Sequence, residues 1–503
     1  MIEVLPDIIE AGASEYGQKV VFAKGETSLS YQGLWEKARR GAKQLGTGGP
    51  VMLYGTPGPD WMAGFFSILC AGRSVVPVPG NAPSDYLRLA IEHAGIETIV
   101  CSAALKDNVQ GQNIVELDSL GISGDSGQLA AVSPDDTALI AFTSGSTQNP
   151  KAVVLTHGNI VANIHGLIAV QQVGINDTFL SLLPTHHLFE LVVGNLAPMV
   201  LGATIKYPQA LLPNRIIEAL QAEDITYMLV VPAILGLITN EIIEQLIEKE
   251  LLPAESRSRS LKEVEALVSG LDNKSIIEIN RVLGPTLKSV VAGGAGLSPL
   301  WNTVFKLLGK ELYIGYGLTE ASPILTCTRT ADCPAGSVGR PLPNVQLKIS
   351  EDTEILAKGP NIMQGYLGEE KLDDGWIRTG DLGSVDSQGN LFIEGRSKEA
   401  MVTSTGETIF PDEIEPYYQH DDFHECCVVP LSGEDGNDRP VLVIYPKEEA
   451  GDLTQNINKM TARAPARSRV RDFIEIDHPL PRTELGKIRR RSLAEQIEEK
   501  QIG

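Results

Sequence analysis

Long uncharged apolar segments are missing from this chain of 503 residues. The apolar run over residues 61–72 ends at Arg73, well short of the roughly 20 residues that cross a bilayer as a helix. The first seven residues, Met-Ile-Glu-Val-Leu-Pro-Asp, are acidic and lack the basic segment that begins a secretory signal. We therefore expect a cytoplasmic protein without an integral membrane span, and peripheral contact with a membrane stays open.

Cysteine and positive charge are also scarce. None of the six cysteines forms a C-x-x-C pair or has a histidine at metal-binding spacing, which favours reduced thiols over a zinc site or disulfides. The formal charge of −22 argues against nucleic acid as a partner, because a phosphate backbone is bound by clustered basic residues. Residues 459–491 are the exception, with ten basic and four acidic side chains.

The chain does contain a regular alternation of short apolar runs and longer segments of helical period between residues 20 and 238. The runs predict strands over residues 51–54, 74–78, 98–101, 178–183 and 227–231. The segments between them predict helices over residues 31–45, 60–71, 85–94, 158–170 and 215–222. Such alternation is typical of parallel sheets with helices on their faces.

Later parts of the chain depart from this rhythm. Residues 240–283 are charged and favour helix, which predicts a helical excursion, and strand patterns return at 287–292 and 311–316. Residues 338–393 read as short strands separated by turns, which predicts a β-rich subdomain closed by a hairpin. Since the chain is too long for one core, we expect an α/β fold with two domains. They are a large N-terminal domain of mostly parallel, helix-flanked sheets (1–395) and a small, mobile α+β lid (396–503).

The most informative segment is Thr-Ser-Gly-Ser-Thr-Gln-Asn-Pro-Lys-Ala at residues 143–152, which follows an apolar run. A strand that ends in small hydroxyl residues and glycine lets the backbone approach a phosphate, and a nearby lysine supplies positive charge. The spacing is not that of a Walker loop. The phosphate-binding residues predicted here are Thr143, Ser144, Gly145, Ser146, Thr147 and Lys151.

This segment resembles the phosphate loop of the ANL superfamily, which includes acyl-CoA synthetases, adenylation domains of non-ribosomal peptide synthesis and luciferases. The family pattern is T-S-G-[ST]-T-G-x-P-K-G-V, and only Gln148 and Ala152 differ from it, each replacing a glycine. A side chain at Gln148 stiffens a loop that must close over ATP. Seven further segments follow in the family's order, so the resemblance covers nearly the whole chain.

Two of these segments concern the acyl group. Residues 183–190 resemble the L-P-x-x-H-x-x-E pattern of fatty-acyl-activating members, and by position His187 separates the acyl pocket from the nucleotide. A histidine that caps a helix is the alternative interpretation. Residues 189–193 lack the aspartate with which amino-acid-activating relatives hold an ammonium group. In the G-G-A-like segment at 291–296, Gly294 and Ala295 are expected against adenine and the acyl chain.

Two segments concern the nucleotide. Residues 316–320 are similar to the Y-G-x-T-E signature, which implies that Tyr316 stacks on adenine beside Gly317 and that Thr319 bonds a phosphate oxygen. Glu320 is then the implied Mg²⁺ ligand, because this hard cation prefers carboxylate and phosphate oxygens. Residues 376–381 resemble W-x-x-T-G-D, in which Asp381 accepts hydrogen bonds from the ribose diol.

The last three segments resemble the junction and the lid. Arg396 is expected to reach nucleotide oxygens, and Lys398 occupies the hinge position. Residues 405–415 resemble the lid segment in which Gly406 lines the thiol channel. Residues 481–489 resemble the C-terminal P-[RK]-[TN]-x-x-G-K segment, whose lysine, Lys487, reaches the α-phosphate.

The resemblance implies that the enzyme activates a medium- or long-chain fatty acid to acyl-AMP and pyrophosphate and then transfers the acyl group to the thiol of CoA. The implied catalytic residues are Lys487, Glu320, Thr319 and His187, with Mg²⁺ as cofactor and ATP and CoA as co-substrates. One alternative is an acyl-[acyl-carrier-protein] ligase, because the basic residues at 459–491 would suit an acidic carrier. The other is a non-catalytic acyl-nucleotide binder. The exact acid and the oligomeric state stay open.

Overall fold

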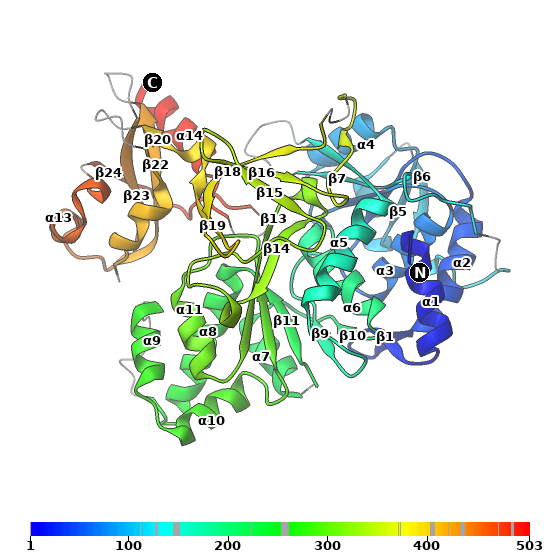
Figure 1. Cartoon of the computed structure of the whole chain (residues 1–503), viewed down its shortest axis with the longest axis horizontal. Coiled ribbons are helices and arrows are strands. Elements are labelled where there is room, and N and C mark those ends of the chain that lie inside the picture. Colours follow the sequence, from blue (N-terminus) through cyan, green and yellow to red (C-terminus); the bar gives the residue numbers. More distant parts are fainter. Residues whose placement is uncertain are drawn as a thin grey trace.

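Parallel strands flanked by helices form most of the chain in the computed structural model, which confirms the predicted α/β fold (Figure 1). Two large sheets are followed by a four-stranded antiparallel sheet and a small C-terminal unit. The structure describes residues 2–110, 112–125, 129–143, 151–222, 224–252, 261–370, 372, 374–402, 408–420, 422–432, 438–470, 472–483 and 487–502.

The first large sheet carries the predicted phosphate loop. Its order is β17 (Gly365–Tyr366), β8 (Ala152–Thr156), β7 (Thr137–Phe142), β4 (Val75–Val78), β3 (Val51–Tyr54), β5 (Thr98–Cys101) and β6 (Asn113–Glu116). From β7 to β6 the strands are parallel, whereas β8 pairs antiparallel with β7 and with β17. The uniformly apolar strands β3 and β4 are buried along their whole length, as strands covered on both faces must be.

The second large sheet holds eight strands. Their order is β14 (Ile324–Arg329), β13 (Glu311–Gly317), β12 (Ser289–Ala292), β11 (Tyr227–Val230), β9 (Thr178–Leu180), β10 (Thr204–Lys206), β1 (Val20–Lys24) and β2 (Thr27–Ser30). Only the two outermost pairs are antiparallel. The strand predicted over residues 178–183 is shorter in the structure and ends at Leu180, and the Leu183 N–H donates to the Glu190 side chain.

Two helices contact strands of both large sheets, namely α3 (Pro59–Cys70) and α5 (His157–Val170). In α3 every residue except Asp60 is buried, as expected of a helix covered on all sides. The other helices of this part are α1 (Leu5–Tyr16), α2 (Tyr31–Leu45), α4 (Ser84–Ala94), α6 (Ala197–Val200), α7 (Pro213–Ala222) and α11 (Leu300–Leu307).

Between β11 and β12 the described residues form three helices and no strand. They are α8 (Pro232–Glu248), α9 (Leu261–Ser269) and α10 (Asn273–Val282), in the lower part of Figure 1. Their apolar faces share a hydrophobic core with β11 and β12. None of the described helices combines the length and the apolar character needed to cross a membrane.

The β-rich subdomain is an antiparallel sheet of β15 (Gln346–Ile349), β16 (Glu354–Lys358), β18 (Ile377–Val385) and β19 (Leu391–Arg396). The predicted hairpin joins β18 to β19, and the Asp386 carboxylate caps its turn by accepting from the Gln388 and Asn390 N–H groups at 2.8 and 2.9 Å. This register places Asp381 directly opposite Arg396.

The C-terminal unit lies at the upper left of Figure 1. Its elements are β20 (Met401–Val402), β21 (Thr408–Ile409), α12 (Pro411–Ile414), β22 (Phe423–Ser432), β23 (Asp438–Pro446), α13 (Leu453–Arg463), β24 (Asp472–Glu475) and α14 (Arg490–Ile502). Within the part of the chain that is described, its two buried apolar clusters contain no residue before Met401. A core of its own is the basis on which we propose a domain that begins near residue 396.

Candidate functional site

Adjacent parallel strands β12 and β13 bring two predicted segments to one edge of the second sheet, where ligands of open α/β sheets bind. The chain leaves β12 through Gly293 and Gly294, and Gly294 has a φ of +77°, which favours glycine. A Cβ atom at Gly293 would lie 2.9 Å from the Phe189 ring, so this glycine lets the His187 segment pack on the backbone. Gly294 and the neighbouring Ala295 are exposed beside this contact.

Tyr316, Asp381 and Arg396 converge although they lie far apart in the sequence. The Tyr316 hydroxyl donates to Asp381 Oδ2 at 2.8 Å, and Arg396 Nε lies 3.3 Å from Asp381 Oδ1. Burial, reinforced by the Asp381 charge, raises the pKa of Tyr316, so its hydroxyl stays protonated and remains a donor. Asp381 is 6% exposed. The result is a buried carboxylate with a defined orientation beside an exposed guanidinium.

Lys487 joins this cluster from the C-terminal unit. Thr483 holds its backbone, since Thr483 N–H donates to the Lys487 carbonyl at 2.7 Å and the Lys487 N–H donates to Thr483 Oγ1 at 3.1 Å. Burial and then the nearby Arg396 charge lower the pKa of Lys487 to about 8, against the opposing effect of Asp381, Glu399 and Asp412. The ammonium is therefore a destabilised cation, and an arriving anion would relieve it.

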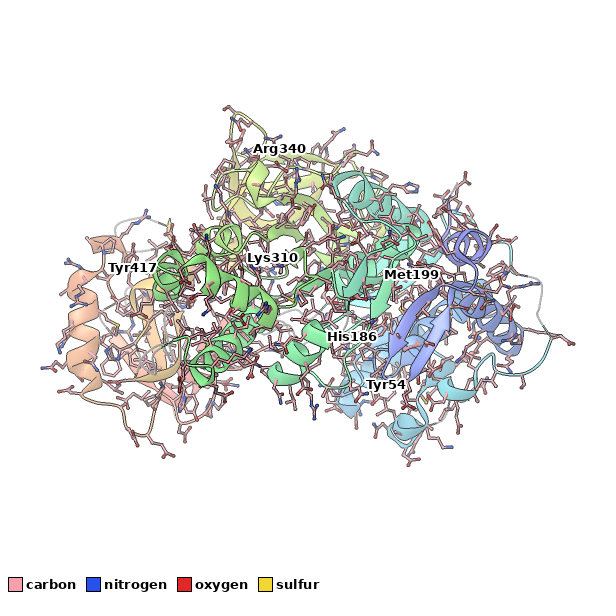
Figure 2. The ribbon with its side chains drawn as sticks, turned by 90° about the horizontal axis from the view of Figure 1, so that it is seen from below. Tyr54, His186, Met199, Lys310, Arg340 and Tyr417 are labelled. Atoms are coloured by element: carbon pink, nitrogen blue, oxygen red, sulfur yellow. The ribbon has the colours of Figure 1, made fainter. Side chains whose placement is uncertain are left out.

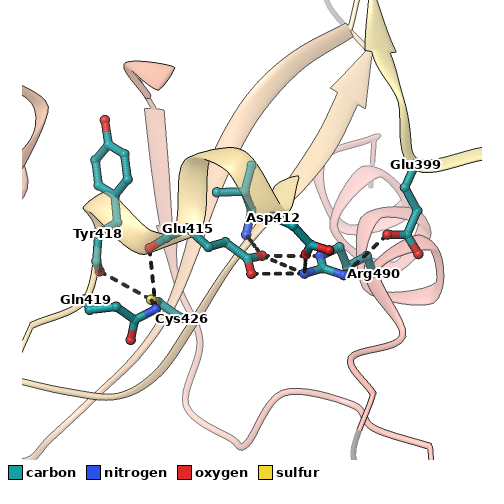
Figure 3. A network of polar contacts seen from close by, with 8 residues as sticks. Glu399, Asp412, Glu415, Tyr418, Gln419, Cys426 and Arg490 are labelled. Atoms are coloured by element: carbon teal, nitrogen blue, oxygen red, sulfur yellow. Dashed lines mark hydrogen bonds and ion pairs between the residues drawn. The ribbon is translucent and has the colours of Figure 1, made fainter. Parts of the chain in front are cut away.

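Arg490, three residues after Lys487, anchors this part of the C-terminal unit through three carboxylates (Figure 3). Its side chain is 12% exposed and lies 2.9 Å from Glu415, 2.8 Å from Asp412 and 3.3 Å from Glu399. Glu399 ends the turn Ser397–Glu399, on which the exposed hinge candidate Lys398 also lies. Arg490 therefore ties the start of α14 to α12 and to the domain junction.

Arg490 is not among the sequence-predicted site residues, the last of which along the chain is Lys487. The family pattern offered a signal, because in full it reads P-[RK]-[TN]-x-x-G-K-[IL]-x-R, and its last, basic position is Arg490 when counted from Pro481. At the junction itself, a Cβ atom on Gly395 would clash with the ring of Phe410. Glycine is therefore favoured at this contact between β19 and Phe410.

Glu320 lies on a single 3₁₀ turn, Thr319–Ala321, that follows β13. Two buried amides hold this turn: Asn163 Nδ2 and Asn361 Nδ2 both donate to the carbonyls of Ala321 and Ile324, at 2.7 to 3.3 Å. Both asparagines were missed in the sequence, because their partners lie in other segments of the chain. The turn presents the Thr319 and Glu320 side chains, which are half-buried.

The described ends of the phosphate loop meet each other. The Thr143 N–H donates to the Lys151 carbonyl at 2.9 Å and closes the β7–β8 hairpin. Lys151 Nζ lies 4.0 Å from the centroid of the Tyr366 ring and 3.5 Å from Glu369 Oε1. The predicted residues Ser144, Gly145, Ser146 and Thr147, together with Gln148 and Gly406, lie outside the described residues.

His187 begins a tightly packed segment that the sequence patterns did not predict. Its N–H donates to the Pro184 carbonyl at 3.0 Å, and residues Phe189–Leu196 then form a π-helix. Figure 2 labels the adjacent His186, whose ring centroid lies 4.2 Å from that of His187, in the central part of the large domain. The Glu190 carboxyl is fully buried, and burial raises its pKa to about 8.

The donor set of the site suits a cation that is shared with a nucleotide. The described residues contain no cluster of three or more histidine, cysteine or acidic side chains that could hold a metal by themselves. Glu320 offers one half-buried carboxylate, and Tyr366 contacts both this carboxylate and Lys151, at the end of the predicted phosphate loop. Mg²⁺ in nucleotide sites commonly takes one or two carboxylates together with substrate phosphates, so these residues fit it. All six cysteines are free thiols.

Residues 9–367 match the sequence model of the family described as AMP-binding enzyme. Human long-chain-fatty-acid–CoA ligase 6 is 30% identical over 410 residues, which cover 73% of this chain and 58% of that protein. Indoleacetate–CoA ligase from Aromatoleum aromaticum is 30% identical over 396 residues, covering 73% of this chain and 69% of that protein. The chain thus spans 58% of the length of the human ligase that it matches.

Solved structures share the fold over nearly the whole chain. The o-succinylbenzoate CoA synthetase from Bacillus subtilis, in complex with its acyl-adenylate intermediate, superposes with a TM-score of 0.78 at 20% identity and covers 97% of this chain and 98% of its own. A fatty acyl CoA synthetase from Mycobacterium tuberculosis superposes with a TM-score of 0.70 at 20% identity and covers 99% of both chains.

Proposed function

Because the chain belongs to the AMP-binding enzyme family, we propose that it activates a carboxylic acid with ATP to an acyl-adenylate and then transfers the acyl group to a thiol. The observation that carries this proposal is the convergence of Tyr316, Arg396 and Lys487 around the buried carboxylate of Asp381. Three of these residues come from the large domain and its edge, and the fourth comes from the C-terminal unit. Such a set suits the base, the ribose and the α-phosphate of one nucleotide.

In the first half-reaction a carboxylate oxygen of the acid attacks the α-phosphorus of ATP, and the bond to pyrophosphate breaks. An anion approaches an anion, so the transition state needs positive charge fixed in place beforehand. Lys487 would supply it at the α-phosphate, while Thr143 and Lys151 would hold the outer phosphates. Glu320 would hold Mg²⁺, whose charge supports the pyrophosphate as it leaves.

In the second half-reaction the thiol sulfur attacks the acyl carbonyl carbon, the bond to AMP breaks, and the thiol proton passes to solvent. Charge repulsion between reactants no longer dominates this step, so a guided thiol matters more than Lys487. We propose that the C-terminal unit rotates about Gly395 and Lys398 between the two steps, and that Gly406 then lines the thiol channel. The clash predicted for a side chain at Gly395 supports a tight junction there.

For the acid, we propose a medium- or long-chain fatty acid. The support is the similarity to long-chain-fatty-acid–CoA ligases and the absence of an aspartate in residues 189–193. In this proposal His187 separates the acyl pocket from the nucleotide, and its contact segment at Phe189 and Gly293 lies where the two would meet. An arylacetic acid is a second candidate, because the indoleacetate–CoA ligase is equally similar.

For the acceptor, we propose CoA. A carrier protein would require a broad basic surface, but several basic side chains in residues 459–491, Arg490 among them, already have partners within the C-terminal unit. Arg467 lies 3.8 Å from Glu413, and Arg469 Nε donates to the Ala464 carbonyl at 3.1 Å. The remaining basic side chains suit the few phosphates of CoA better than an extended acidic helix.

ATP–pyrophosphate exchange across a panel of fatty, arylacetic and amino acids tests this proposal. We expect exchange with at least one fatty acid and none with amino acids. Free CoA and holo-carrier protein are then compared as acceptors at several salt concentrations. If turnover occurs only with the carrier protein and is lost as the salt concentration rises, the acceptor is a carrier protein and not CoA. If the protein binds nucleotide but catalyses no exchange with any of these acids, it is a non-catalytic acyl-nucleotide binder.

A further inference from the structure

Tyr366 connects two residues that the proposed function assigns to different tasks. It lies on the edge strand β17, where it pairs with Val153 of β8, two residues beyond Lys151. Its hydroxyl donates to Glu320 Oε1 at 2.9 Å, and its ring faces the Lys151 ammonium at 4.0 Å. One half-buried side chain thus contacts the metal-binding carboxylate with its polar end and the phosphate-loop cation with its ring.

The contact with Glu320 is supported at two points. The Met363 N–H donates to the Glu320 carbonyl at 2.8 Å, so residues 363–366 hold both the main chain and the side chain of Glu320. A phenol hydroxyl carries a single hydrogen, and here it is donated to Glu320 Oε1, so Tyr366 is the donor of this bond. A carboxylate with one oxygen fixed in this way has a restricted orientation and presents its other oxygen in a defined direction.

Lys151 is held by the same turn of chain. Its ammonium lies over the Tyr366 ring, which attracts a cation through the negative face of its π system, and 3.5 Å from Glu369. The Glu369 N–H donates to the Tyr366 carbonyl at 3.0 Å, which fixes the turn between the two side chains. Lys151 is therefore paired with Glu369 and with the Tyr366 ring, whereas the Glu320 carboxylate accepts the hydrogen bond of the Tyr366 hydroxyl.

We propose that Tyr366 is a positioning residue that aligns Glu320 for Mg²⁺ and holds Lys151 in place for the nucleotide phosphates. This inference rests on the proposed function, because it assigns a role to the nucleotide site of that reaction. Tyr366 itself touches neither the reacting acid nor the thiol. It acts through the two side chains that it contacts.

The test separates the hydroxyl from the ring. Tyr366→Phe removes only the donor to Glu320, whereas Tyr366→Leu also removes the face that holds Lys151. Tyr417→Phe is the matched control, because Tyr417 is 43% exposed and lies on the C-terminal unit, at the left of Figure 2. Binding of α,β-methylene-ATP is measured by calorimetry with Mg²⁺ and with EDTA, which gives a readout that is independent of turnover.

We expect Tyr366→Phe to reduce the Mg²⁺-dependent gain in nucleotide affinity by about ten-fold, the value of a hydrogen bond to a charged group, with binding in EDTA unchanged. Tyr366→Leu should also weaken binding in EDTA by about three-fold, since the lysine loses a cation–π contact. The control should match the wild type in both conditions.

A double-variant cycle shows whether the hydroxyl acts through Glu320. In a Glu320→Gln background, Tyr366→Phe should cause no further loss of Mg²⁺-dependent affinity. Additive losses, or a Tyr366→Phe protein with the full Mg²⁺ effect, would overturn the inference. If the wild type and Tyr366→Phe bind nucleotide with the same Mg²⁺ effect, the role of Tyr366 is refuted and the proposed function still stands. A wild type without acid-dependent exchange would refute the proposed function.

Discussion

The charge state of Lys487 gives the sharpest prediction for the first half-reaction. Only the ammonium form can support the charge that develops at the α-phosphate, and burial with the Arg396 charge lowers the pKa of Lys487 to about 8. With a pKa of about 8, roughly 90% of the side chains are charged near pH 7 and roughly 10% near pH 9. Adenylation should therefore lose about ten-fold for each pH unit well above this pKa.

The same shift predicts a stability effect. The pKa is lowered from 10.5 to about 8 in the folded state, so the unfolded chain binds more protons within that window and stability rises with pH through it. Near neutral pH the folded protein carries the cost of charging a buried lysine, which corresponds to at most about 3 kcal/mol. Lys487→Met should therefore abolish adenylation and raise the free energy of unfolding near pH 7 by up to about 3 kcal/mol.

The assay is ATP–pyrophosphate exchange at subsaturating ATP from mildly acidic to alkaline pH, because kcat/KM reports the free enzyme. Lys487→Arg is the informative control, since a guanidinium stays charged over this range and its slower reaction should show no alkaline decline. Transfer from supplied acyl-adenylate to the thiol does not depend on this charge, so its pH profile should be the same in the wild type and in Lys487→Arg. An alkaline decline that persists in Lys487→Arg, or a wild-type profile that stays flat, would refute the assigned role.

Three further predictions concern other parts of the site. Because the pKa of Glu190 is raised to about 8, its contribution to stability is lost as pH rises from about 4.5 through 8, and Glu190→Gln should flatten this decline in urea unfolding curves. Gly395→Ala should clash with Phe410 at the domain junction, slow both adenylation and thiol transfer, and lower the free energy of unfolding by about 1–3 kcal/mol. Gly236→Ala is the control, because the space around Gly236 is open, and it should be neutral or stabilising by about 1 kcal/mol. Equal behaviour of the two alanine variants in thermal unfolding and kinetics would contradict the prediction for Gly395. Arg490→Met should destabilise the C-terminal unit by about 3–5 kcal/mol, because it leaves Glu415 buried without its partner, and the added change Glu415→Leu should recover much of that loss in chemical denaturation.

Much of the fold could be predicted because periodicity and turn residues are local signals. The apolar run at β3 and the helical period of α2 gave bounds that match the structure, and the hairpin between β18 and β19 followed from its Gly and Asn residues. The π-helix Phe189–Leu196 could not be found in this way, because its backbone is fixed by the buried Glu190 and by packing from elsewhere.

The site residues likewise fall into those that the sequence predicts and those that it does not. Tyr316, Glu320 and Asp381 sit in short segments whose residue types suggest their chemistry, and the structure brings Tyr316 and Asp381 into contact. Tyr366 and Asn163 carry no such signal, because a lone tyrosine or asparagine acquires its role only from partners more than 40 residues away. Their contacts follow from the tertiary structure alone.

Transfer of oxygen from the acid to AMP tests the acyl-adenylate route most directly. The wild-type protein is incubated with ATP, thiol and an acid that carries ¹⁸O in its carboxylate, and the nucleotide products are examined by mass spectrometry. If the carboxylate attacks the α-phosphorus, one ¹⁸O atom should appear in AMP for each thioester formed, and none in pyrophosphate. Formation of ADP with label in inorganic phosphate, or AMP without label, would contradict the account.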